Sequence, residues 1–185
     1  IRDVAVTGVQ TCVFRSEQWI EVHRDAHALG LPTNATLLFG HFETPEEKVD
    51  HMVQLRALQD DGIAAGSPAR FQAFIPLPFL PGNTDFSYLP GPSREEKLRT
   101  IAVSRLVLDN FPHIKGHWVM LEEDVTQEGL AYGLDDLSGT LVEERVAHAT
   151  TVQTPMGLTR DRISELIRGG GRVPEERSEE HTSEL

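Results

Sequence analysis

Residues 33–47 read TNATLLFGHFETPEE, and this stretch decides the fold class. Its first seven residues form a short, largely apolar run that predicts a strand. Thr44 is then typical of a helix N-cap, Pro45 of the first helical position, and Glu47 of the third position of a capping box. Apolar residues spaced three and four apart continue the predicted helix to about Gly62. A strand therefore passes through a short loop directly into a helix.

The same alternation extends in both directions along the chain. Further strands are predicted at 71–77, 114–121 and 137–142, and further helices at 17–29, 93–108, 124–133 and 159–168. Alternating strands and helices indicate right-handed βαβ units and a parallel sheet. No glycine-rich phosphate loop follows any predicted strand, which argues against a nucleotide-binding doubly wound fold. The pattern favours an α/β fold of about four βα units, a fragment of a (β/α)8 barrel, since a whole barrel needs about 250 residues.

Composition excludes several classes of protein. The chain has 185 residues with 29 acidic and 17 basic side chains, a formal net charge of −12, which argues against binding to a nucleic-acid backbone. No run approaches the roughly 20 apolar residues that span a bilayer, so no membrane segment is expected. Cys12 is the single cysteine, which excludes an intrachain disulfide and a cysteine-ligated cluster built from this chain alone. A reducing, cytoplasmic setting is the expected location.

The two ends of the chain are predicted to be foreign to the protein. Residues 1–16 contain VTGVQTC and resemble the translation of a DNA-sequencing adapter, and residues 177–185 resemble the reverse-direction adapter. Such segments are excluded from fold reasoning. The expected organisation is therefore an adapter-like segment at 1–16, the C-terminal half of a barrel at 17–176, and an adapter-like tail at 177–185.

Polar residues recur on one face of the predicted strands. Side chains alternate along a strand, so Asn34 and Thr36 share a face, as do Gln72 and Phe74 in the second strand. In the predicted third strand His117 shares a face with Lys115 and Val119. The opposite faces are apolar and are expected to meet the helices. The polar faces predict a barrel interior that holds a polar ligand, with a hydrogen-bonded polar layer in a closed core as the alternative.

Ligand sites in such barrels lie at the carboxyl ends of the strands. That position selects the residues after the first strand, 40–43, the loop 79–84, and the pair 122–123. Glu43 precedes a helix that is already capped, so its carboxylate is expected to act elsewhere; the alternative is a charge that complements the helix dipole. His23 and His27 lack the HExxH pattern and are interpreted as a solvated helix face, and no metal site is predicted.

Six segments in the same order carry a resemblance to a known family: 34–44, 71–76, 98–106, 108–115, 118–121 and 135–144. From Trp19 to about Arg172 the chain resembles the C-terminal half of the radical S-adenosylmethionine enzymes of the aminodeoxyfutalosine synthase family, which act in menaquinone biosynthesis. The resemblance implies part of a (β/α) barrel that holds S-adenosylmethionine and a 4Fe–4S cluster in the complete enzyme. It also implies addition of a 5′-deoxyadenosyl radical to 3-[(1-carboxyvinyl)oxy]benzoate with loss of CO2.

The resemblance also implies roles for individual residues. Gly40 and Glu43 match the family's Gly-x-x-Glu near the adenosyl group, and Asn34 and Thr36 would face the cofactor from the same strand. Gln72 and His117 are chosen as substrate contacts from face parity alone. A reductant protein such as a flavodoxin or ferredoxin is the expected partner.

The sequence departs from the family pattern at several places, among them Leu80, residues 116–117, residues 122–123 and residues 149–153, and three alternatives remain. The cluster-binding CxxxCxxC is missing from this sequence, so the chain is expected to be inactive alone. Two alternatives are related enzymes: a cyclic dehypoxanthine futalosine synthase, or the homologous subunit of the deazaflavin-forming FO synthase. The third belongs to another class, a non-catalytic βα-barrel module that binds a small acid.

Overall fold

The computed structural model describes residues 16–140, 155 and 157–177. Its elements, in chain order, are α1 (Ser16–Ala28), β1 (Thr33–Phe39), α2 (Pro45–Ala64), β2 (Phe71–Pro78), α3 (Arg94–Val107), β3 (His113–Gly116), α4 (Trp118–Leu121), α5 (Glu123–Tyr132), β4 (Asp136–Leu137) and α6 (Arg160–Gly169). Three helices begin where the sequence predicts, because each start depends on a capping residue only a few positions away. Thr44 and Glu47 form the predicted capping box, and the side chains of Ser93 and Thr159 accept the backbone N–H of the third helical residue.

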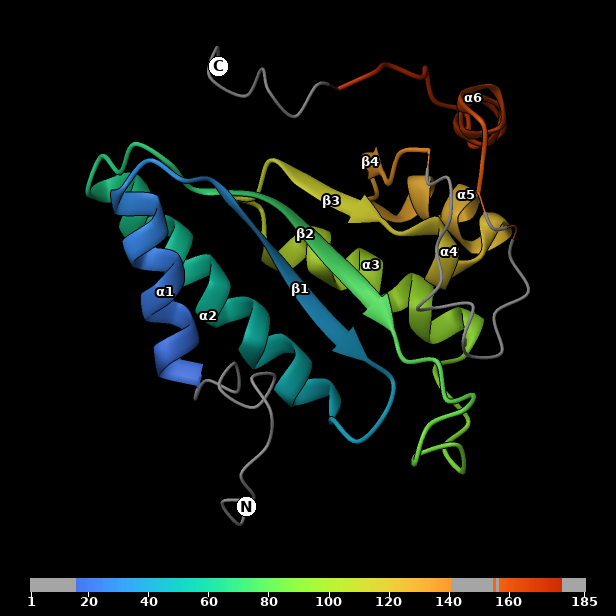
Figure 1. The fold of residues 1–185 in the computed structure, drawn as a ribbon, viewed down its shortest axis with the longest axis horizontal. Coiled ribbons are helices and arrows are strands. Elements are labelled where there is room, and N and C mark those ends of the chain that lie inside the picture. Colours follow the sequence, from blue (N-terminus) through green and yellow to red (C-terminus); the bar gives the residue numbers. More distant parts are fainter. Residues whose placement is uncertain (1–15, 141–154, 156, 178–185) are drawn as a thin grey trace.

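The four strands form one parallel sheet in the order β1-β2-β3-β4. Consecutive strands are neighbours, as winding a βα barrel requires. In Figure 1, α1 and α2 lie side by side along one side of this sheet, and α3 follows them on the same side. The predicted α/β fold, a barrel fragment of about four βα units, is confirmed.

The main hydrophobic core lies between the sheet and these helices. Ala35, Phe74 and Ile114 point into it from three neighbouring strands, and each is fully buried. Leu55 of α2 and Ile101 of α3 meet them from the helix side. A second cluster joins α4 to α6 through Trp118, Val119, Leu158 and Leu166. The helices therefore cover one face of the sheet, and the opposite face, here called the open face, carries Asn34, Thr36 and Leu38.

The predicted third strand at 114–121 is wrong in its second half. β3 ends at Gly116, and residues 118–121 form the short helix α4, whose turn is closed by N–H groups of Met120 and Leu121 donating to the carbonyl oxygen of His117. Four consecutive apolar residues fit either a buried strand or one buried helical turn, and periodicity does not separate the two. The predicted strand at 137–142 is also shorter: β4 is Asp136–Leu137, and residues 141–142 lie outside the described residues.

The face parity predicted for β2 is wrong as well. Thr33 pairs with Phe71, but Asn34 pairs with Ala73, so Gln72 is an extra residue that forms a bulge. Beyond the bulge the register puts Ala73 and Ile75 beside Asn34 and Thr36 on the open face, while Phe74 turns toward the helices. A bulge exchanges the two faces for every later residue of the strand, and alternation counted from the sequence does not include it.

His23 and His27 do not form the solvated helix face that the sequence indicated. Nδ1 of His23 and Nε2 of His27 each lie 2.8 Å from Oγ1 of Thr33, and His27 is only 3% exposed. His51 of α2 lies nearby, with its ring 6.2 Å from that of Trp19. Thr33, at the start of β1, therefore anchors α1 to the sheet through two imidazoles.

Burial lowers the pKa of all three histidines below the ordinary value of 6.5, and in His23 the neighbouring His27 lowers it further. Between the lowered pKa and 6.5 the unfolded chain binds more protons than the folded one, so the free energy of unfolding falls as the pH falls.

We expect the urea midpoint to decrease from pH 7.5 to 5.5. His27→Gln should flatten this dependence, whereas Arg24→Gln, which removes only an exposed ion pair with Asp61, should leave it intact. A midpoint independent of pH in this range would contradict the assignment.

In the described part of the chain, no helix combines the length and apolar character needed to cross a membrane.

Candidate functional site

The loop after β1, residues 40–44, is closed by its own glutamate. The backbone N–H of Gly40 donates to Oε1 of Glu43, and that of His41 donates to Oε2 at 3.0 Å. The side chain of Glu43 is 12% exposed. The sequence predicted that this carboxylate would be free to act outside its own loop. That prediction is wrong, because both carboxylate oxygens accept hydrogen bonds from the loop backbone.

The charge of Glu43 is stabilised by the same contacts. Burial by itself would raise the pKa of the Glu43 carboxyl, but the N–H donors of Gly40 and His41 outweigh it, so the pKa lies below its ordinary value. The loop consequently carries a fixed negative charge at neutral pH. Oε1 also lies 4.0 Å from Nζ of Lys48, a cation from the first turn of α2.

Gly40 is required by the shape of this loop. Its φ is +88°, in the left-handed region that favours glycine, and a β-carbon added there would lie 2.5 Å from Cβ of Pro92. Pro92 immediately precedes Ser93, the N-cap of α3. The loop after β1 and the start of α3 are therefore in close contact at the carboxyl edge of the sheet.

The open face carries polar residues toward the amino end of β1, away from this loop. Asn34 and Thr36 are exposed there, as predicted from alternation in β1, while Ala35 and Phe39 on the other side of the strand are fully buried. Across the sheet Asn34 pairs with Ala73 and Ala73 with His113. These three paired residues form a row across the sheet with polar side chains at its two ends, Asn34 and His113, and the small side chain of Ala73 between them.

An ion pair on the open face was not among the predicted site residues. Nζ of Lys115 lies 4.0 Å from Oδ2 of Asp136, and the two side chains are 14% and 12% exposed. Arg177 also bonds to Oδ2 of Asp136. Asp136 belongs to a segment that carries the family resemblance, and that signal could have selected it.

The two residues chosen as substrate contacts have different positions. Gln72 stands at the bulge of β2, so alternation does not assign it a face. His117 lies between β3 and α4 instead of within a strand, and its Nδ1 is 2.9 Å from Oγ of Ser138, just after β4. His117 is thus at the carboxyl edge of the sheet, near the ends of β3 and β4. Both roles remain predictions.

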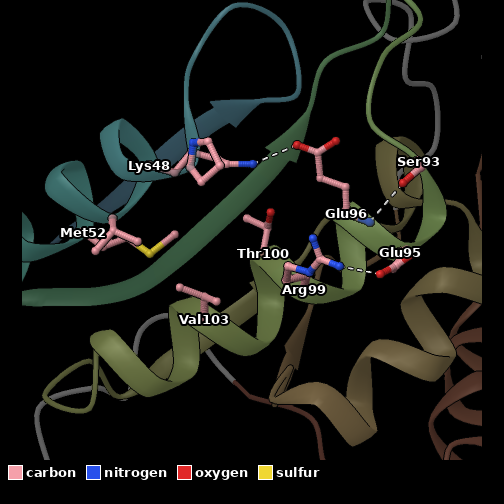
Figure 2. Close-up of a pocket in the computed structure, with 10 residues that line it drawn as sticks. Lys48, Met52, Ser93, Glu95, Glu96, Arg99, Thr100 and Val103 are labelled. Atoms are coloured by element: carbon pink, nitrogen blue, oxygen red, sulfur yellow. Dashed lines mark hydrogen bonds and ion pairs between the residues drawn. The ribbon is translucent and has the colours of Figure 1, made fainter.

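Exposed aromatic rings lie on the loops after β1 and β2. Phe42 and Phe86 are 59% and 45% exposed and meet edge to face at a centroid distance of 5.2 Å, and Tyr88 is 71% exposed. A separate groove lies between α2 and α3, on the helix side of the sheet, where Met52, Thr100 and Val103 are among its lining residues (Figure 2).

Within the described ranges, no group of three or more His, Cys, Asp or Glu side chains is placed to hold a metal ion. Cys12 lies outside those ranges. The described residues therefore do not fit a 4Fe–4S cluster. Asn34 and Thr36 supply an exposed amide and an exposed hydroxyl, both donors and acceptors, on the open face toward the amino end of β1.

These features define a class of protein: a parallel βα-barrel segment whose polar open face and strand-end loops form a candidate ligand site. The profile of the CofH/MqnC C-terminal region matches residues 68–184. The chain belongs to this family.

Curated relatives agree with that assignment. The chain is 46% identical over 166 residues to an aminodeoxyfutalosine synthase of Thermus thermophilus, an alignment that covers 88% of this chain and 43% of that enzyme. It is 40% identical over 175 residues to the enzyme of the same name from Streptomyces coelicolor, with the same two shares. A cyclic dehypoxanthine futalosine synthase of Streptomyces coelicolor is 36% identical, with 88% of this chain and 39% of that enzyme covered. The chain thus spans about two fifths of the length of these relatives.

Proposed function

We propose that this chain is the C-terminal part of a radical S-adenosylmethionine aminodeoxyfutalosine synthase. The observation that carries the proposal is the order of the identities: 46% and 40% to two enzymes of that name, against 36% to a cyclic dehypoxanthine futalosine synthase. A 5-amino-6-(D-ribitylamino)uracil--L-tyrosine 4-hydroxyphenyl transferase of Methanosarcina mazei is also 36% identical. The proposed substrate is 3-[(1-carboxyvinyl)oxy]benzoate, and the reductant is a protein such as a flavodoxin or ferredoxin.

The proposed role of this chain is to bind and orient. Asn34 and Thr36, lower on β1 than the loop closed by Gly40 and Glu43, offer an amide and a hydroxyl to the cofactor. S-adenosylmethionine supplies, when reduced, the adenosyl radical for the addition. The Lys115–Asp136 pair and His117 lie farther along the sheet, where they would orient the carboxylates of the substrate and limit access of water.

A chimera tests this proposal. Residues 17–176 replace the corresponding C-terminal part of the Thermus thermophilus aminodeoxyfutalosine synthase, and the reconstituted protein is assayed anaerobically with S-adenosylmethionine, a chemical reductant and 3-[(1-carboxyvinyl)oxy]benzoate. Formation of aminodeoxyfutalosine, with an unmodified enzyme as the positive control, is the expected result. The substrates of the cyclic dehypoxanthine futalosine synthase and of the tyrosine-dependent transferase are assayed in parallel.

Each outcome of this assay selects one alternative. Product from one of the parallel substrates alone would assign the chain to that branch of the family. A folded chimera that binds a small aromatic acid but forms no product from any substrate would favour the non-catalytic binding module. The chain assayed by itself is expected to give no turnover.

A further inference from the structure

Lys48 connects two loops at the carboxyl edge of the sheet. Its Nζ lies 2.8 Å from Oε1 of Glu96 in the first turn of α3 and 4.0 Å from Oε1 of Glu43 in the loop after β1. Figure 2 shows the Lys48 side chain reaching across from α2 toward Glu96. The side chain of Lys48 is 12% exposed and that of Glu96 35%, so the lysine end of the contact is the shielded one.

The ammonium group of Lys48 also lies against an aromatic ring. Nζ lies 5.7 Å from the centroid of the Phe39 ring, whose residue is fully buried at the end of β1. A shielded charge is stable only when it is paired, and the two carboxylates supply that pairing. Because both carboxylates lie within 4.0 Å of one ammonium, replacing Lys48 by an uncharged residue would remove the positive charge that the Glu43 and Glu96 carboxylates share.

The same two segments also meet without Lys48. A β-carbon at Gly40 would overlap the ring of Pro92, so the backbone of the loop is packed tightly against the residue before the N-cap of α3. Backbone contact fixes how close the loop and α3 approach each other. Within the loop, Nδ1 of His41 lies 2.8 Å from Oε2 of Glu43, and Lys48 is the cation that links Oε1 of Glu43 to Glu96 of α3. The orientation of Glu43 in turn determines the hydrogen bonds of the Gly40 and His41 N–H groups.

We propose that Lys48 is a positioning residue for the cofactor loop: by bridging Glu43 and Glu96 it holds residues 40–43 against α3 in the conformation that receives the adenosyl group. The claim that this conformation receives the adenosyl group rests on the proposed function. Lys48 acts through Glu43 and does not itself contact the ligand.

The test compares four variants of the chimera described under the proposed function, because S-adenosylmethionine is proposed to bind in the complete enzyme. Lys48→Met removes the charge and keeps much of the side-chain volume, whereas Lys48→Arg keeps the charge. Glu96→Gln removes the strong partner and leaves Lys48 in place. Arg99→Met is the matched control, since Arg99 is an exposed cation of α3 that pairs only locally with Glu95 (Figure 2).

Two readouts are measured on each variant. The first is amide hydrogen exchange at Gly40 and His41, and the second is the dissociation constant of the chimera for S-adenosylmethionine from equilibrium dialysis. Lys48→Met is expected to accelerate exchange at both amides at least tenfold and to weaken binding at least fivefold. Glu96→Gln should change the exchange rates and the dissociation constant in the same direction but by a smaller factor. Lys48→Arg should leave both close to the values of the unsubstituted protein, and Arg99→Met should change neither.

Failure of this inference and failure of the proposed function are distinguishable. Unchanged exchange at Gly40 and His41 in Lys48→Met would overturn the positioning role. Faster exchange with unchanged affinity would also overturn it, because Lys48 would then support the fold alone. A folded chimera with Lys48 intact that does not bind S-adenosylmethionine would contradict the proposed function, independently of any Lys48 variant.

Discussion

Gly40→Ala is expected to reduce the free energy of unfolding by about 2–5 kcal/mol. A left-handed backbone costs an L-residue about 1–2 kcal/mol, and forcing an extra carbon into packed structure costs about 1–3 kcal/mol more. Both costs apply here, because the φ of Gly40 is +88° and the added carbon would lie 2.5 Å from Pro92. Urea denaturation of the 185-residue chain measures the difference.

Gly30→Ala is the matched control for this prediction. Gly30 has a similar φ of +80°, but a β-carbon there would meet nothing within 4 Å. It should therefore show only the backbone cost of about 1–2 kcal/mol. Equal losses in the two variants would mean that Pro92 yields without cost, and the close contact between the loop and α3 would then lose its support.

Phe74→Ala is expected to cost about 3–5 kcal/mol, the usual cost of removing a buried aromatic ring. Phe74 is fully buried and its ring meets that of Phe111 edge to face at 6.4 Å. The matched control is Ile75→Ala, one residue along β2 on the open face and only partly buried. Its cost should be well below that of Phe74→Ala.

The same pair of variants tests the bulge at Gln72. Uninterrupted alternation from the sequence places Ile75 toward the helices and Phe74 toward the interior of the barrel, so it predicts a large loss for Ile75→Ala. A larger loss in Ile75→Ala than in Phe74→Ala would contradict the register shift between β1 and β2. The slope of the unfolding free energy against urea concentration should be the same in both variants, which would confirm that both losses refer to the same folded state.

The parts of the fold that sequence reasoning found are those with local causes. The bounds of β1 and the starts of α2, α3 and α6 depend on caps and on one apolar run, all readable within a few residues. The bulge at Gln72 depends on how β2 pairs with β1, which is a non-local property. α4 depends on the burial of Trp118 against residues of α6, far along the chain.

The candidate site also contains residues whose positions could be predicted from the sequence and others whose positions could not. Asn34 and Thr36 could be assigned to the open face because β1 alternates without interruption. The closed form of the Gly40–Glu43 loop could not be predicted, since a carboxylate that bonds two backbone N–H groups leaves no pattern in residue type. The role of Lys48 was missed for another reason: its partner Glu96 is 48 residues away.

The hydroxyl of Thr33 has a consequence for proton positions. It carries one proton and contacts Nδ1 of His23 and Nε2 of His27. When that proton lies in one of these two bonds, the other imidazole must donate its own N–H to the oxygen. The tautomers are then coupled: either both rings carry the proton on Nε2 or both carry it on Nδ1. The two arrangements differ by the direction of the hydroxyl and by the ring nitrogen that carries the proton in each histidine, so the tautomer of one histidine changes together with that of the other.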